Sequence, residues 1–327
     1  MKALVLKKGG NIDNLEKKEV KKPQIKDNEL LIKVHATSLN PSDYQTIEYL
    51  DENTKDIVLG LDVAGEVVNK GKNVKKFDIG DRVFYLRQME NPNGGFGEYS
   101  KNPEDSTYKI PVNVSYEDAV TLPGAGFTAY YILKNRFKID KNKTILIHGG
   151  SGNLGQFAIQ LAKIMSLNII TTASSKNIEM LKKQGIEKII DYKNQNIERE
   201  IKNITNNKGV DYIISSVNPE QATKDLGSLN FNGEIAFVSG FPDFNNIHFY
   251  DKSITMHEIA FGKLFEQKDL NIKKSLENIA NDLVSLVDKN KLSIPNKTLI
   301  KLDEVPQYLK KLKNNEIQGK IIVNKII

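Results

Sequence analysis

The chain has 327 residues, enough for two domains with a core each, and 39% hydrophobic and 27% charged residues are typical of a soluble globular protein. The net charge of +6 does not indicate a nucleic-acid partner, because only four of the 47 basic residues are arginine and the lysines alternate with acids. The absence of cysteine excludes disulfides, thiolate zinc sites and cysteine nucleophiles, and it fits a reducing compartment.

The chain begins with MKALVLKKGG, whose apolar run is too short for the core of a signal peptide. No later segment approaches the roughly 18 consecutive apolar residues of a membrane span. We therefore expect a cytoplasmic protein without membrane contact.

Residues 1 to about 117 have the pattern of an antiparallel β region. Short apolar segments are separated by turn-rich stretches, and their lengths and spacing predict a barrel or sandwich. The segments are Lys2–Leu6, Glu29–Ala36, Val63–Lys70 and Asp81–Tyr85.

From about Tyr116 the pattern changes to alternating helices and strands. Such regular alternation predicts an α/β fold with a doubly wound parallel sheet of the Rossmann type. The predicted strands are Thr144–His148, Asn168–Ala173, Lys188–Asp191, Tyr212–Ser215 and Glu234–Ser239. The predicted helices are Glu117–Leu122, Thr128–Asn135, Leu154–Met165, Asn177–Gln184, Ile197–Asn206 and Pro219–Leu229.

A glycine-rich loop follows the first of these strands. Gly150-x-Gly152-x-x-Gly155 matches G-x-G-x-x-G in the strand–turn–helix context that dinucleotide binding requires. The glycines permit a tight turn, close approach of a pyrophosphate and close packing of the helix. We expect this loop, including Asn153 and Leu154, to bind the cofactor; the alternative is a glycine-rich turn without a ligand.

The second strand ends in Ser174-Ser175-Lys176, where enzymes that use NAD normally carry an acid for the adenosine ribose. Two hydroxyls and an ammonium are instead suited to a 2′-phosphate, so we expect NADP(H). A serine N-cap would explain the serines equally well. Tyr192, after the third strand, is placed to cover the adenine or phosphate, unless it is a plain surface tyrosine.

The fourth and fifth strands are followed by Ser216-Val217 and by Gly240-Phe241-Pro242. Ligands of open parallel sheets bind at the carboxyl ends of the strands, so we expect these five residues to line the cofactor site. Phe241 and Phe261 either line the substrate pocket or only pack.

The C-terminal part is predicted to hold a long amphipathic helix, Leu270–Asp288, and a strand, Lys297–Lys301. A helix, Glu304–Lys313, with Asp303 as its N-cap, and a strand, Gly319–Lys325, follow. We expect the last strand to rejoin the N-terminal β region.

Motifs along nearly the whole chain resemble the medium-chain dehydrogenase/reductase family, and within it the zinc-free quinone oxidoreductase branch. The motifs are His35–Tyr44, Leu59–Val67, Ile79–Tyr85, Gly94–Tyr99, Leu122–Tyr130, the glycine loop, Asp191-Tyr192 and Gly319–Val323. The resemblance implies a GroES-like β-barrel domain (1–117), a Rossmann dinucleotide-binding domain (118–264) and a C-terminal return to the first domain (265–327). It also implies a homodimer.

The sequence departs from the zinc-using branch of that family at its metal ligands. The catalytic cysteine is missing from the stretch Ser38–Asp43, and the branch's Gly-His-Glu reads Gly60-Leu61-Asp62. His35, His148, His248 and His257 have no ligand spacing, so no zinc site is expected.

The resemblance also assigns residues near the nicotinamide. Asn40 is expected at the ribose or carboxamide, Tyr44 as a donor to the substrate carbonyl, and Thr128 beside the ribose. The alternatives are a turn signal for Asn40, a core aromatic for Tyr44 and a helix N-cap for Thr128. Asp43 and Asp62 are expected to be structural, through hydrogen bonds or Arg82.

Without zinc, the expected reaction is hydride transfer from NADPH to a small-molecule quinone or α,β-unsaturated carbonyl, whose conjugated oxygen takes the developing charge. Two alternatives are an enoyl-thioester reductase of the same family and a non-catalytic NADPH-binding sensor.

Overall fold

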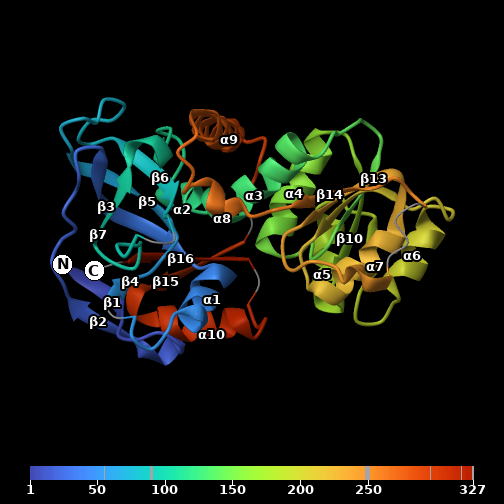
Figure 1. Ribbon diagram of the computed structural model, residues 1–327, viewed down its shortest axis with the longest axis horizontal. Helices are drawn as coiled ribbons and strands as arrows, with labels where there is room; N and C mark the ends of the chain where they lie inside the picture. The colour runs from blue at the N-terminus through green and yellow to red at the C-terminus, as the bar shows by residue number, and fades with distance from the viewer. Residues whose placement is uncertain (55, 89–90, 247–250, 295, 318, 326–327) are drawn as a thin grey trace. The chain divides into compact units, whose positions relative to one another are not determined.

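The computed structural model describes residues 1–54, 56–88, 91–246, 251–294, 296–317 and 319–325 (Figure 1). It forms two compact units, Met1–Phe127 with Gly262–Ile327, and Thr128–Phe261. Compactness does not show where an independently folding domain ends, so the expected domain boundaries after residues 117 and 264 stay predictions.

The first unit is built on β-sheets. Its strands are β1 (Lys2–Leu6), β2 (Leu15–Glu19), β3 (Glu29–Ser38), β4 (Ile57–Val58), β5 (Asp62–Lys70), β6 (Arg82–Leu86), β7 (Tyr99–Pro103), β8 (Tyr108–Lys109), β15 (Lys297–Lys301) and β16 (Lys320–Lys325). One sheet has the order β2-β1-β4, and the other has the order β15-β16-β3-β5-β6-β8, with β7 also paired to β3. β16 runs antiparallel to β3, with Ile322 opposite Ser38, so the last strand joins the N-terminal strands as expected.

The long strand β3 shows why these residues form strands. Leu30, Ile32 and Val34 are buried, whereas Lys33 between them is exposed, which is the two-residue period of a sheet with one face on a core. The antiparallel β region that the sequence predicts is confirmed.

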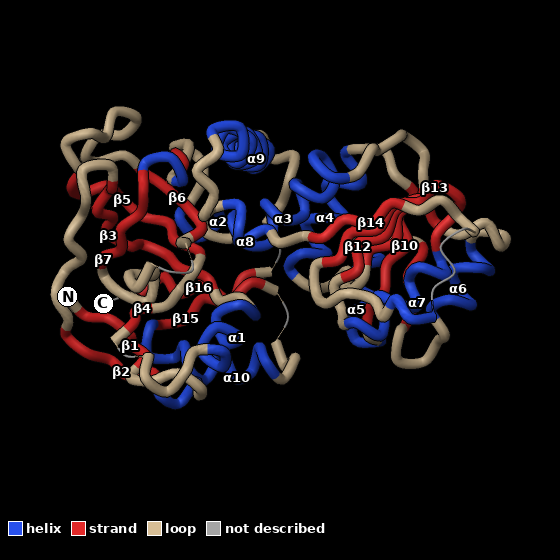
Figure 2. Tube along the Cα trace, in the orientation of Figure 1, coloured by secondary structure: helices blue, strands red, loops and turns tan. Residues whose placement is uncertain are grey.

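Helix α1 of the first unit was not predicted from the sequence. Asn40-Pro41 reads as a turn, but Pro41 is the first residue of the helix, where its fixed φ fits and its missing N–H costs nothing. The Asn40 backbone N–H donates to Asp43 Oδ2 at 2.8 Å. α1 packs against α10, and the two helices lie side by side in Figure 2. The helices are α1 (Pro41–Tyr49), α2 (Tyr116–Ala119), α9 (Leu270–Asp288) and α10 (Val305–Lys313).

Two helical boundaries differ from the prediction. The N-cap of α10 is Glu304, and Asp303 lies in a 3₁₀ turn, Leu302–Glu304, because Pro306 fits only the first turn of the helix that follows. The segment expected as a helix from Thr128 is irregular: a π-helical segment (Leu122–Gly126), α3 (Phe127–Tyr130) and another π-helical segment (Tyr131–Arg136) follow one another.

The second unit is a doubly wound sheet of six parallel strands, as the alternation predicts. The strands are β9 (Thr144–Ile147), β10 (Asn168–Ala173), β11 (Lys188–Asp191), β12 (Val210–Ser215), β13 (Leu229–Phe237) and β14 (Thr255–Glu258). Their order is β11-β10-β9-β12-β13-β14, the 3-2-1-4-5-6 order of a Rossmann fold. The edge strand β14 was not predicted from the sequence. The helices are α4 (Asn153–Ile164), α5 (Ser175–Lys183), α6 (Ile197–Ile204) and α7 (Pro219–Ser228), and α8 (Phe261–Leu264) follows the sheet.

Buried aliphatic side chains from the strands form the core of this unit. Leu146, Ile170, Ile190, Ile213 and Ile235 come from five neighbouring strands and belong to one cluster. A parallel sheet covered on both faces needs such apolar strands, which explains why they read as continuous apolar runs in the sequence.

Candidate functional site

The turn between β9 and α4 has glycine where a side chain has no room. A Cβ at Gly150 would lie 2.2 Å from Thr171 Oγ1, and one at Gly155 would lie 2.3 Å from the Gly149 carbonyl oxygen. Gly152 is the N-cap of α4. The loop therefore packs tightly on β10, and glycine is required at positions 150 and 155.

Asn153, Leu154 and Gly155 form the first turn of α4. The N–H groups of a first turn have no acceptor within their own helix and carry the positive end of the helix dipole. Asn153 Oδ1 is buried without a hydrogen-bond partner among the described residues, but as an acceptor it does not itself attract an anion, so the backbone N–H groups are the donors here. This end of α4 is thus suited to hold a phosphate group.

A buried polar network lies under the glycine loop. Gly149 N–H donates to Thr172 Oγ1 at 3.0 Å, and Thr172 Oγ1 lies 3.2 Å from His148 Nδ1. His148 Nε2 lies 2.8 Å from Asp225 Oδ1, and Ser215 Oγ donates to Asp225 Oδ2 at 2.7 Å. A neutral His148 satisfies every contact if Nε2–H donates to Asp225 and Nδ1 accepts from Thr172. We call these four side chains, of His148, Thr172, Ser215 and Asp225, the His148 network.

Sequence reasoning missed the His148 network. His148 was considered only as a metal ligand, although it is the last residue before the glycine loop. Its polar character at the end of an apolar strand was the available signal, since a buried imidazole needs hydrogen-bond partners.

The turn after β10 lies at the carboxyl edge of the sheet, as expected, and the Asp191 carboxylate lies beside it. Ser174 is buried at the N-cap of α5, which begins at Ser175, and Lys176 is exposed. The Ser175 hydroxyl donates to Asp191 Oδ2 at 2.6 Å, and this bond is the largest cause that lowers the pKa of Asp191. Tyr192 is half-exposed, and its N–H donates to the carbonyl of Ala173, so it lies beside the end of β10.

The residues after β12 and β13 lie at the same edge of the sheet as the glycine loop, because all these strands are parallel. Ser216 Oγ donates to the His148 carbonyl at 3.4 Å. Val217 and Phe241 are half-exposed apolar side chains, and Pro242 is buried. Gly240 has a φ of +83° and would press a Cβ onto Pro219. The second unit thus gathers these predicted cofactor residues at one edge.

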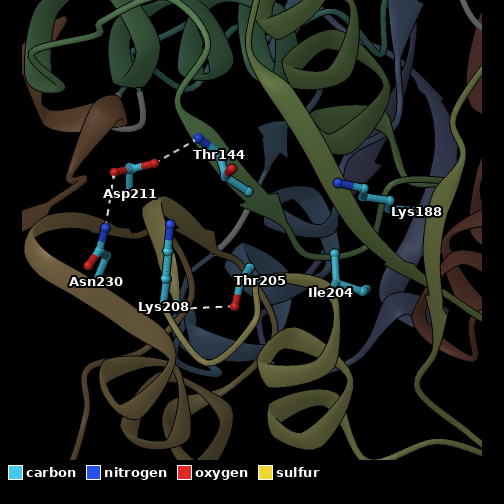
Figure 3. A pocket seen from close by; sticks show the side chains of 8 residues that line it. Thr144, Lys188, Ile204, Thr205, Lys208, Asp211 and Asn230 are labelled. Carbon is cyan, nitrogen blue, oxygen red and sulfur yellow. Dashed lines mark hydrogen bonds between the residues drawn. The ribbon is translucent and has the colours of Figure 1, made fainter.

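A polar hollow lies at the opposite edge of the same sheet (Figure 3). Thr144, Lys188 and Asn230 belong to the amino ends of β9, β11 and β13, and they line it with Lys208. Asp211 also lines the hollow, and its carboxylate accepts from the Thr144 backbone N–H at 2.8 Å, so this side chain is already bonded to the start of β9. Ligands of such sheets bind at the carboxyl ends, and this hollow is therefore not the predicted cofactor site.

The first unit buries a charged cluster at Asn40. The Lys320 ammonium donates to Asn40 Oδ1 at 2.7 Å and to Asp62 Oδ2 at 3.1 Å. The same Asp62 oxygen accepts from Asn40 Nδ2 at 2.8 Å and from Ser38 Oγ at 2.6 Å. Lys320 is 1% exposed and Asp62 is 0% exposed. We call Ser38, Asn40, Asp62 and Lys320 the Lys320 cluster.

The hydrogen bonds expected for Asp62 are therefore present, but its cation is Lys320 and not Arg82. The Arg82 guanidinium donates instead to the carbonyls of Pro111 and Val114. Sequence reasoning assigned no role to Lys320, although a lysine directly before the apolar run Ile321–Val323 was a visible signal for a paired, buried ammonium.

Asp43 and Tyr44 follow Asn40 on α1. Burial raises the pKa of Asp43 to about 7, although the Asn40 N–H stabilises its charged form. Asp43 Oδ1 has no hydrogen-bond partner in the described part of the chain. Tyr44 packs partly against the core of the first unit, and burial, followed by the Glu48 carboxylate, raises the pKa of its phenol.

Thr128 and Phe261 begin and end the second unit. Thr128 is 9% exposed and lies within α3, not at the N-cap of a helix. Phe261 is buried with its ring 5.4 Å from that of Tyr131, so its packing role is the one seen here.

The histidines are engaged in other contacts. His35 stacks on Tyr116 with ring centroids 4.5 Å apart, and His257 Nε2 lies 2.9 Å from Glu234 Oε2. His248 lies outside the described residues. Within the described ranges, no three His, Asp or Glu side chains gather as a metal site would require. The helices of the same ranges include none with the length and apolar character of a membrane span.

Comparison with known proteins identifies the family. An alcohol dehydrogenase GroES-like domain matches residues 26–112, and a zinc-binding dehydrogenase domain matches residues 153–281. A zinc-type alcohol dehydrogenase-like protein of Staphylococcus aureus is 32% identical over 284 residues, 82% of each chain. The chain belongs to the medium-chain dehydrogenase/reductase family and is quinone oxidoreductase-like.

Other relatives of this chain are matched over shorter stretches. A trans-enoyl reductase of Pyricularia oryzae is 36% identical over 198 residues, 57% of this chain and 56% of that enzyme. A quinone oxidoreductase of Sus scrofa is 32% identical over 220 residues, 66% of each chain. The quinone oxidoreductase structure from Coxiella burnetii has a TM-score of 0.83 at 27% identity and covers 99% of both chains.

Zinc does not fit the residues at the position where the zinc-using branch binds it. The two stretches that supply its ligands there meet here at Ser38, Asn40 and Asp62, and the Lys320 ammonium bonds to two of these residues. Leu61, in place of the histidine, is buried and offers no donor atom. An ammonium 3.1 Å from the carboxylate already supplies the positive charge that a cation would bring.

Proposed function

We propose that this reductase is an NADPH-dependent, zinc-independent oxidoreductase that reduces a quinone or an α,β-unsaturated carbonyl. The observation that carries the proposal is the glycine loop, where neither Gly150 nor Gly155 has room for a Cβ, at the carboxyl edge of a parallel sheet. Quinone oxidoreductases among the relatives support the reaction class.

In this proposal the second unit holds the dinucleotide along one edge. The first turn of α4 binds the pyrophosphate, and the turns after β10 and β11 bind the adenosine end. The turns after β12 and β13 bind the nicotinamide end, with Thr128. The residues are Thr128, Gly150, Gly152, Asn153, Leu154, Gly155, Ser174, Ser175, Lys176, Tyr192, Ser216, Val217, Gly240, Phe241 and Pro242.

The preference for NADPH rests on the turn after β10. Ser174, Ser175 and Lys176 supply two hydroxyls and an exposed ammonium, and no acid follows β10 directly. Asp191 lies next to this turn but is occupied by hydrogen bonds from Ser175 and Asn194. We expect a lower KM for NADPH than for NADH, and equal values would refute the preference.

The reaction itself needs a hydride donor and hydrogen-bond donors. A bound nicotinamide supplies the hydride. We assign Asn40 to orient the ring through its amide and Tyr44 to donate to the substrate oxygen. The Tyr44 phenol is protonated at neutral pH, as tyrosines ordinarily are, and burial raises its pKa further. Tyr44→Phe is expected to lower kcat about 10²-fold, as for the loss of one oxyanion donor.

An enoyl-thioester substrate is the second candidate. It is favoured by the trans-enoyl reductase, which is 36% identical to this chain over 198 residues. Its conjugated carbonyl accepts a hydride in the same way as an enone does. We therefore assign Asn40 and Tyr44 the same roles for this substrate. A non-catalytic NADPH sensor is the alternative if nothing is reduced.

The test follows NADPH, then NADH, consumption with 9,10-phenanthrenequinone, a simple enone and an enoyl thioester in metal-free buffer. Turnover of the quinone or enone without added zinc supports the proposal, and turnover of the thioester alone selects the second candidate. NADPH binding by fluorescence without any turnover supports the sensor. The homodimer stays a prediction, which light scattering after size exclusion tests.

A further inference from the structure

Lys320 is a buried, charged residue of the first unit to which the proposed reaction gives no role. A fully buried lysine is rare, because the ammonium loses its hydration and must be paired and hydrogen-bonded. Here Asn40 Oδ1 and Asp62 Oδ2 accept two of its three N–H bonds, at 2.7 Å and 3.1 Å. The ion pair therefore has a defined geometry around the Asn40 side chain.

The chemistry of these partners fixes which way the Asn40 amide faces. Lys320 can only donate hydrogen bonds, and an ionised Asp62 can only accept them. The amide oxygen must face Lys320 and its nitrogen must face Asp62, because the flipped amide would oppose donor to donor and acceptor to acceptor. One N–H of Asn40 Nδ2 is left over, and Asn40 is the least buried member of the cluster at 8% exposed.

The cluster is also closely packed by the π-helical segment Leu122–Gly126. A Cβ on Gly124 would lie 3.1 Å from Asn40 Oδ1 and 3.2 Å from both Asp62 carboxylate oxygens. Asp62 Oδ1 is buried and has no hydrogen-bond partner among the described residues. The carboxylate thus depends on Lys320 as its charge partner, and a side chain at position 124 would press on both the amide oxygen and the carboxylate.

We propose that Lys320 is a positioning residue that locks the Asn40 amide in one orientation and balances Asp62, in the place where zinc-using members of the family bind their metal. The inference rests on the proposed function, in which Asn40 contacts the cofactor or substrate. Lys320 then acts only through Asn40 and touches no reacting atom.

A double-mutant cycle of Lys320→Met and Asn40→Ala tests this, with kcat/KM for NADPH and the quinone as readout. Each single change is expected to lower kcat/KM about 10²-fold, the order of magnitude for a misplaced site group. The double variant should be no worse than the poorer single variant, because both remove the same orientation. Fully additive losses would overturn the inference, and so would wild-type kinetics in a folded Lys320→Met.

The double variant Lys320→Met/Asp62→Asn removes both charges. It therefore separates the effect of Lys320 on stability from its effect on the orientation of Asn40. Its Tm is expected to return toward the wild-type value while kcat/KM stays low; recovery of both would overturn the inference. If Lys320→Met does not fold, this variant takes its place in the cycle with Asn40→Ala. Lys301→Met, at an exposed position on neighbouring β15, is the control and should keep wild-type kinetics.

Failure of the proposed function gives a different pattern. Wild type and Lys301→Met would then turn over none of the three substrates, whether or not NADPH binds, and the inference would fall with the proposed function. Normal wild-type turnover with an unaffected Lys320→Met would sink the Lys320 inference alone.

Discussion

Each unit of the molecule buries one polar network beside residues of the proposed site, and the two are charged differently. The Lys320 cluster contains an ion pair, with Lys320 and Asp62 at most 1% exposed. The His148 network contains an imidazole that satisfies its partners while neutral, as argued from its contacts with Thr172 and Asp225. Removing Asp62 should therefore leave the Lys320 ammonium without its counter-charge in the first unit, whereas removing the Asp225 carboxylate should mainly leave unmade hydrogen bonds in the second.

The largest effect is expected for Asp62→Ala. It leaves the Lys320 ammonium buried without its counter-ion, which costs about 3–5 kcal/mol of unfolding free energy in comparable cases. Urea denaturation of Asp62→Ala, beside Lys320→Met/Asp62→Asn, measures this. The double variant should lose far less stability than Asp62→Ala. Equal losses in the two variants would show that lost packing, and not the unpaired charge, lowers the stability.

The next effect depends on pH and concerns Asp43, beside the same cluster. Burial raises the pKa of Asp43 to about 7 from an ordinary value of 3.8. Between these values the folded carboxyl keeps its proton and the unfolded one releases it, so unfolding becomes easier as pH rises. The stability contributed by the neutral carboxyl is complete below about pH 4 and lost by about pH 7, at up to roughly 1.4 kcal/mol per pH unit.

Asp43→Asn isolates this contribution. Its side-chain oxygen can still accept from the Asn40 N–H, but it cannot ionise. Urea denaturation at pH 5, 6, 7 and 8 should give a flatter curve for the variant than for wild type, with the variant gaining stability at high pH. Parallel curves would contradict a raised pKa at Asp43.

The two units also differ in how much of their structure could be predicted from the sequence. The glycine loop and the helix–strand alternation are local patterns, so the Rossmann sheet and the placement of Gly150 to Gly155 followed from the sequence alone. The Lys320 cluster joins residues up to 280 positions apart, through a strand that returns to β3, and no local pattern encodes that meeting.

Particular elements explain the other misses. β14 is an edge strand with mostly exposed residues, so it lacks the alternation that marks a half-buried strand. α1 begins with Asn40-Pro41, and these residue types favour turns and helix starts alike. The carboxylate of Asp191 next to Ser175 was missed because it comes from the neighbouring strand, 16 positions later.

In the second unit, Asp225→Asn should have a smaller effect on stability than Asp62→Ala. It turns an acceptor of bonds from His148, Gln221 and Ser215 into a partial donor and leaves one buried group unsatisfied, which costs about 1–3 kcal/mol. Because His148 adjoins the glycine loop, we also expect the Kd for NADPH to rise about tenfold. Fluorescence titration measures it; an unchanged Kd with lowered Tm would make the network purely structural.

The smallest effect is expected at Thr172, whose hydroxyl accepts from Gly149 N–H and faces His148. Thr172→Val keeps the shape but leaves the loop N–H and the imidazole without this partner, at a cost of about 1–3 kcal/mol, toward the lower end because only neutral groups lose a partner. Thr172→Ser is the matched control, since it keeps the hydroxyl and loses a methyl group. If the hydroxyl holds the loop, valine should weaken NADPH binding several-fold more than serine does. Equal weakening by both would mean that the methyl packing, and not the hydrogen bond, supports the loop.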